Sequence, residues 1–224
     1  LKKLSKYHKI KVLFLTDSVS GRRRSGYVNS TKYEISEIEL KKIKNDIKTR
    51  QNQARKALSI LGISDMRSLD IPSQELDQVP FLKIIKEIEQ EIATNKFNVI
   101  FTHHYNDLNL DHRIAYEATI TAARPILGSS VSAILSFEIP SSTEWRKPHK
   151  FNPNLYVDVS SEIKTKINAL KSYTHEIQKY PLPRSKEIIE AVAKRWGSLS
   201  GFKNAEAFEI IMSRMTDLNK MSIY

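Results

Sequence analysis

The most chemically dense stretch of this 224-residue chain is the polar segment 103–113. It contains three of the six histidines, His103, His104 and His112, together with Asp107 and Asp111. Neutral imidazole is the commonest metal ligand in proteins, and a neighbouring carboxylate fixes its tautomer. The segment therefore indicates a metal site. The alternative is structural, with an aspartate capping the helix that follows and the histidines hydrogen-bonded locally.

The composition limits which side chains can act as nucleophiles or metal ligands. The chain has no cysteine, so thiolate nucleophiles, disulfides and cysteine-ligated zinc are excluded, and any metal must be bound by histidine and carboxylate. No apolar run approaches the length of a membrane span and no signal peptide is visible, so we expect a cytoplasmic protein.

The chain is basic, with 36 Lys and Arg against 25 acidic residues and a net charge of +11. This favours anionic partners, but most lysines lie between apolar residues of helical segments, which is typical of a solvated helix face. No DNA- or RNA-binding motif supports a nucleic-acid partner. The compact cluster Arg22, Arg23 and Arg24 could meet an anionic ligand or could simply be exposed to solvent.

The elements that must position the polar segment follow from apolar periodicity. Strands are predicted at 11–16, 97–102, 131–137 and 155–159, with a short strand within 63–69. Residues 1–9 are predicted to be the end of a helix. Further helices are predicted at 34–61, which Gly62 ends, at 76–93, at 111–123 and at 185–212. One more helix is predicted to begin with Ser160 or Ser161 as its N-cap and to extend to about residue 171. The alternation predicts an α/β fold, with a mostly parallel sheet and helices on both faces, in one domain over 1–224.

Ligands of open α/β sheets bind beyond the carboxyl ends of the strands. The loops 17–24 and 103–112 both follow predicted strands, so both are candidate walls of a site. The second carries the histidines and aspartates.

The segment 101–113, Phe-Thr-His-His-Tyr-Asn-Asp-Leu-Asn-Leu-Asp-His-Arg, resembles a signature of the LmbE/PIG-L family of zinc-dependent de-N-acetylases. Residues 11–22 resemble the family's second strand and the loop after it. Residues 137–145, 180–185 and 201–208 resemble later landmarks of its bacterial branch, so the likeness spans nearly the whole chain.

The resemblance implies a Rossmann-like fold and hydrolysis of an N-acetyl group from an amino sugar or sugar conjugate, such as an N-acetylglucosamine derivative. It also implies one zinc ion, held by two histidines and an aspartate, with a second aspartate as general base. His112 matches one of the ligands. Three protein ligands leave a coordination position for water.

The sequence departs from the family pattern in two places. The His-Pro-Asp-Asp type motif that supplies two ligands is absent and would fall before Leu1, so we expect the 224 residues to lack the first strand and that loop, and to be inactive alone. Asn109 stands where some relatives carry a histidine thought to stabilise the oxyanion. Its amide can donate a hydrogen bond but cannot transfer a proton.

The remaining candidates each have two readings. Asp111 could orient a ligand or only start the helix, and Asp107 could lie behind a ligand or cap the helix. Arg113 could bind an anionic substrate group or pair with a carboxylate. Further candidates for the substrate pocket are Arg50, which matches a family arginine, His104 and Trp145, whose indole could pack on a sugar face or within its loop.

The expected partner is an N-acetylated sugar, which could be anionic and could belong to sugar-nucleotide or surface-glycan metabolism. A homo-oligomer is compatible with the sequence. The alternative function is a catalytically inactive pseudoenzyme or sugar-binding protein on the same fold.

Overall fold

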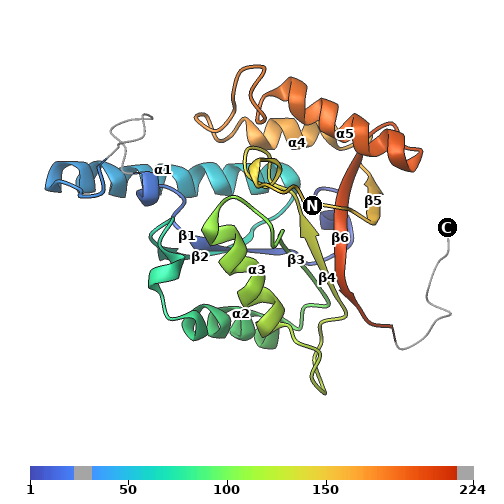
Figure 1. Cartoon of the computed structure of the whole chain (residues 1–224), viewed down its shortest axis with the longest axis horizontal. Helices are drawn as coiled ribbons and strands as arrows, with labels where there is room; N and C mark the ends of the chain where they lie inside the picture. Colours follow the sequence, from blue (N-terminus) through green and yellow to red (C-terminus); the bar gives the residue numbers. More distant parts are fainter. Residues whose placement is uncertain (23–31, 216–224) are drawn as a thin grey trace. The chain divides into compact units, whose positions relative to one another are not determined.

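The computed structural model describes residues 1–22 and 32–215 (Figure 1). The chain forms two compact units. The first comprises Leu1–Gln78 and Tyr156–Glu206, and the second comprises Val79–Leu155 and residues 207–215. The arginine cluster at 22–24 lies outside the described residues, apart from Arg22 at the end of the 3-10 turn η2 (Ser20–Arg22).

The first unit is built around two parallel strands, β1 (Lys11–Thr16) and β2 (Asp65–Ile71) (Figure 1). The connection between them contains α1 (Glu37–Leu61), which begins with a capping box between Ser36 and Glu39. It ends at Gly62, whose φ of 80° is the left-handed conformation that glycine adopts without strain. The predicted end of this helix is therefore confirmed. The unit also contains α4 (Ile163–Leu170), which packs on α1, and α5 (Lys186–Ser200).

The second unit contains a parallel strand pair, β3 (Val99–His103) and β4 (Ala133–Phe137). The helices α2 (Phe81–Asn95) and α3 (Leu110–Ala122) pack against each other (Figure 1). A small core of Ala123, Val131 and Ile134 lies beneath them, with side chains such as Ile92 and Ile100 packed against it. Because β3 and β4 run parallel, the loops that follow them leave from the same edge of the sheet.

The predicted helix over 185–212 is wrong beyond Ser200. There the chain turns through Gly201, whose φ is 76°, and residues 205–213 form the strand β6 (Ala205–Ser213). β6 pairs antiparallel with β4, in the strand order β3-β4-β6-β5, where β5 is Leu155–Asp158. The backbone pairing to β4, which is distant in sequence, decides the conformation of an apolar run that also suits a helix.

Two smaller expectations are also wrong. Residues 1–9 contain only a single 3-10 turn, η1 (Leu4–Lys6), and not the end of a longer helix. The N-cap of α4 is Glu162 rather than Ser160 or Ser161, because the Ser160 hydroxyl donates to Asp158 Oδ1 at 2.6 Å instead.

The α/β fold class with mostly parallel strand pairing is confirmed. Three short 3-10 turns complete the elements: η2, η3 (Leu76–Gln78) and η4 (Thr143–Trp145). Among the residues that the structure describes, no helix has the length and apolar character to cross a bilayer. The compartment stays a prediction.

Candidate functional site

The loop 104–109 joins β3 to α3 and is fixed to the first turn of that helix. Asn109 is the N-cap of α3, and its Oδ1 accepts a hydrogen bond from the backbone N–H of Asp111 at 2.9 Å. The Nη1 of Arg113 donates to the carbonyl oxygens of Asp107 at 2.7 Å and Leu108 at 2.9 Å. These bonds give the loop one defined path.

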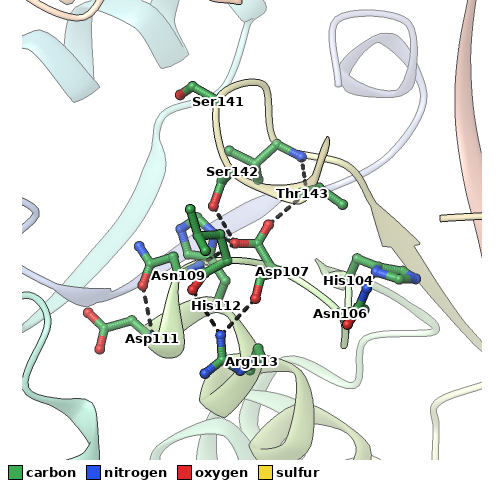
Figure 2. A network of polar contacts seen from close by, with 12 residues as sticks. His104, Asn106, Asp107, Asn109, Asp111, His112, Arg113, Ser141, Ser142 and Thr143 are labelled. Carbon is green, nitrogen blue, oxygen red and sulfur yellow. Dashed lines mark hydrogen bonds and ion pairs between the residues drawn. The ribbon is translucent and has the colours of Figure 1, made fainter. Parts of the chain in front are cut away.

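Asp107 is the centre of this loop (Figure 2). It is fully buried, with 0% of its surface exposed. Its carboxylate accepts hydrogen bonds from Thr143 Oγ1 at 2.6 Å, from the Asn109 N–H at 2.8 Å, from His112 Nδ1 at 3.0 Å and from Ser142 Oγ. Burial alone would raise the pKa of Asp107, but the bonds from His112, Ser142 and Thr143 outweigh it and lower the pKa to about 2. Asp107 is therefore ionised at neutral pH.

The charge on Asp107 determines the tautomer of His112. A carboxylate can only accept, so the proton of a neutral His112 lies on Nδ1 and its Nε2 keeps a lone pair. The side chain of His112 is 21% exposed, so the ring is not fully enclosed by the core. A carboxylate that orients an imidazole through one nitrogen, leaving the other to bind, is the usual environment of a histidine metal ligand.

His103 supports the ring of His112 from one side. The two imidazoles are stacked, with centroids 4.2 Å apart and an interplanar angle of 14°. Burial is the main cause that lowers the pKa of His103 to about 3, with a smaller contribution from His112 and an opposing one from Asp107. His103 is therefore neutral at neutral pH and packs on His112.

A second loop, which follows β4, supplies the two hydroxyls that bind Asp107. The backbone N–H of Leu108 donates to the carbonyl of Ser142 at 3.4 Å, which joins the two loops. Ile139 N–H donates to Thr143 Oγ1 at 2.7 Å, so that hydroxyl accepts one bond and gives its own proton to Asp107. Ser142 and Thr143 are not among the residues predicted for the site. The available signal was the parallel pairing of adjacent strands, whose carboxyl-terminal loops must meet.

The other predicted residues of this unit lie in different surroundings. His104 is fully buried, its Nε2 lies 3.1 Å from Glu209 Oε2, and its ring is directed away from Asp107 (Figure 2). Asp111 is buried in the first turn of α3, and Trp145 lies in η4 with half of its surface exposed. The structure thus brings together the following predicted residues on one loop and helix turn: Asp107, Asn109, Asp111, His112 and Arg113.

Arg50, on α1, belongs to the first unit. It lines a cavity of about 320 Å³ inside that unit, and its Nη2 donates to Glu176 Oε1 at 2.5 Å. Its guanidinium is therefore held by a carboxylate rather than placed on an open helix surface.

Among the described residues, one side chain has the surroundings of a metal ligand. His112 offers Nε2 with a carboxylate behind it. Residues 1–22 and 32–215 contain no group of three or more His, Asp or Glu side chains arranged to bind a metal ion together. A catalytic zinc site needs three such ligands.

The family model of PIG-L, described as GlcNAc-PI de-N-acetylase, matches residues 1–123, which is more than half of the chain. The chain therefore belongs to the PIG-L family. The match includes β1, β2 and the whole segment from β3 through α3, so the resemblance inferred from the sequence is confirmed.

Solved structures share the fold at low sequence identity. The N,N'-diacetylchitobiose deacetylase from Pyrococcus horikoshii is 18% identical with a TM-score of 0.66, over 94% of this chain and 76% of that one. The 4-carboxy-2-hydroxymuconate hydratase GalB from Pseudomonas putida KT2440 is 18% identical with a TM-score of 0.69, over 96% and 91%. Teicoplanin deacetylase Orf2, solved in a zinc-inhibited form, is 10% identical with a TM-score of 0.64, over 96% and 93%. Deacetylases and a hydratase thus share one fold, so the fold by itself does not fix the reaction.

Proposed function

We propose that this protein is a zinc-dependent hydrolase that removes an N-acetyl group from an amino sugar or sugar conjugate. Membership of the PIG-L family supports the reaction class. The observation that carries the proposal is the buried Asp107 carboxylate on His112 Nδ1, which leaves Nε2 as a ligand. Two of the similar structures are named as deacetylases, which agrees with this reaction.

His112 is proposed as one zinc ligand. The resemblance implies two more from a His-Pro-Asp-Asp type motif, which residues 1–224 do not contain. Zinc, when bound in such a site, supplies a water of lowered pKa and polarises a carbonyl group. Asp107 keeps the His112 proton at Nδ1, and the stacked His103 restricts rotation of the ring.

Three further side chains are proposed to act on the substrate. The Oδ1 of Asn109 is used as the cap of α3, which leaves its amide N–H groups to donate to the oxygen that becomes negative during attack on the acetyl carbonyl. Trp145, which is half exposed, offers an indole face for a sugar ring. Asp111 is proposed to help orient the ligand from the first turn of α3.

The test compares the wild-type complete gene product with the variants His112→Ala and His149→Ala. His149 is an exposed histidine of the same unit and serves as the matched control. Zinc content is measured by mass spectrometry after removal of loose metal, and acetate release is measured on N-acetylglucosamine derivatives. We expect about one zinc per wild-type and His149→Ala chain, and at least a tenfold loss of zinc affinity in His112→Ala. A His112→Ala protein that keeps its zinc refutes the ligand assignment, and zinc-loaded protein that is inert on the substrate panel refutes the activity.

A pseudoenzyme or sugar-binding protein is the second candidate. The observation in its favour is that the described residues contain no complete three-donor group. The same experiment separates the candidates when residues 1–224 are assayed beside the complete gene product. Sugar binding without zinc and without acetate release in both proteins would establish the pseudoenzyme.

A further inference from the structure

The first unit contains a cavity of about 320 Å³ beside the carboxyl end of β1. Phe14, Met66 and Leu170 give it an apolar wall, and the ring of Tyr173 adds an aromatic one. Tyr173 is half-buried, and this burial raises the pKa of its hydroxyl. A small cavity with apolar walls and a few converging polar groups is the usual form of a small-molecule site.

Two arginines and one glutamate form the polar part of this cavity. Arg50 Nη2 donates to Glu176 Oε1 at 2.5 Å, and Arg184 Nη1 donates to Glu176 Oε2. The side chains of Arg50 and Glu176 are 13% and 8% exposed, so the cluster is largely withdrawn from water. Two guanidinium groups share one carboxylate, and the three side chains together carry one excess positive charge.

The other carboxylate of the cavity, Asp17, is engaged elsewhere. Its Oδ1 accepts hydrogen bonds from the backbone N–H groups of Val19 at 2.9 Å, Ser20 at 3.0 Å and Ser73 at 3.4 Å. These donors fix the loop after β1, and among the described residues the ion-pair partner of both Arg50 and Arg184 is Glu176 rather than Asp17.

One donor of the cluster is unused. The Nε of Arg184 is buried and has no hydrogen-bond partner among the residues that the structure describes. A buried donor without a partner costs about 1–3 kcal/mol, so such groups call for an acceptor. An arginine offers its donors in a planar fork that matches the oxygens of a carboxylate or a phosphate.

We propose that this cavity binds a sugar-sized ligand through a carboxylate or phosphate group, which Arg50 and Arg184 bind together. Glu176 is a positioning residue that holds both guanidinium groups side by side. Tyr173, whose ring centroid lies 5.5 Å from Arg50 Cζ, offers a flat face to the body of the ligand. The choice of a sugar as the ligand rests on the proposed function, whereas the anion site rests only on the geometry of this unit.

The proposal is tested by calorimetric titration of the full chain with glucuronic acid, glucose 6-phosphate and glucose, in the presence of a chelator. The two anionic probes distinguish a carboxylate from a phosphate, and glucose measures binding without a charge. We expect at least tenfold tighter binding of one anionic probe than of glucose, and loss of that difference in Arg50→Gln and Arg184→Gln. Arg55→Gln is the matched control, because Arg55 lies on the same helix as Arg50, is exposed and does not line the cavity.

A variant of Glu176 distinguishes an anion-binding cluster from an ion-pair cluster that only stabilises the fold, because only the first predicts a gain of affinity. Glu176→Gln removes the carboxylate that competes with the ligand, so we expect it to tighten binding of the anionic probe at least threefold, provided that circular dichroism shows a folded protein. Equal affinity for charged and neutral sugars, or an anion preference unchanged in both arginine variants, overturns the proposal. The titration depends on neither metal nor turnover. An anion preference seen here, together with zinc-loaded protein that releases no acetate in the assay above, would refute the proposed activity and leave the anion site in place.

Discussion

Replacing Asp107 tests whether this buried carboxylate organises the site. The change Asp107→Ala removes the acceptor of four hydrogen bonds, from Ser142, Thr143, Asn109 and His112. Because the side chain is fully buried, solvent water cannot take its place as the acceptor. The expected result is a large loss of stability in the second unit.

The magnitude follows from the donors left behind. Each buried donor without a partner costs about 1–3 kcal/mol, and removal of one partner from a buried charged network costs about 3–5 kcal/mol in total, because neighbouring groups relax. We therefore expect the free energy of unfolding to fall by about 3–5 kcal/mol in Asp107→Ala. Asp107→Asn keeps one oxygen that can accept from Asn109 and His112, so we expect a smaller loss of about 1–2 kcal/mol.

The assay uses tryptophan fluorescence during urea unfolding, with a chelator present. The chain has two tryptophans, and a common Trp196→Phe background leaves Trp145 as the reporter, next to the loop that binds Asp107. Asp77→Ala, at an exposed aspartate, is the control and should change stability by less than about 0.5 kcal/mol. An Asp107→Ala protein within about 1 kcal/mol of its parent would refute the reasoning, as would equal losses for alanine and asparagine.

Three further predictions concern the first unit, each measured as a free energy of unfolding. Gly197→Ala should destabilise by about 1–3 kcal/mol although alanine favours helices, because a Cβ there would lie 2.5 Å from the Phe202 carbonyl oxygen; a stabilised variant would contradict this. The charge of Lys166 lowers the pKa of Glu206 below 4.5, so the ion pair stabilises the fold above that pH and this contribution disappears as the pH falls. Lys166→Gln should therefore cost about 0.5 kcal/mol at pH 7 and progressively less as the pH falls below 4.5, and a loss independent of pH would be the contrary result. Ser36→Ala should cost about 1 kcal/mol by removing the cap of α1, and no loss would show that the cap is dispensable.

Local signals were enough to predict the elements that carry the site. The apolar run before His103 and the polar loop after it predict β3 and its turn, and the helix expected at 111–123 is observed as α3, Leu110–Ala122. Gly62 ends α1 where expected, since glycine alone adopts a positive φ without strain. The failure at β6 has a non-local cause: Phe208, Ile210 and Ile211 suit a helix as well as a strand, and only the partner strand decides.

The hydrogen bonds to Asp107 include some that the local sequence predicts and some that it does not. Its partners Asn109 and His112 lie only two and five residues away in sequence and could be anticipated as a local cluster. Ser142 and Thr143 lie 35 and 36 residues away and reach Asp107 only because β4 pairs with β3 in a particular register, His103 opposite Phe137. A shift of that register by one residue would exchange the faces of β4 and displace the loop after it.

The two adjacent histidines illustrate how strand geometry divides residues that look equivalent in a motif. Successive side chains at the end of a strand point to opposite faces of the sheet. His103 therefore stacks on His112, while His104 pairs with Glu209 and with the backbone N–H of Asn106. The place of His104 in the substrate pocket stays a prediction, and its ring lies beside a different set of residues from that of His103. The alternation of side chains where β3 ends thus separates His103, which lies against His112, from His104, which follows the strand and lies beside Glu209 of β6.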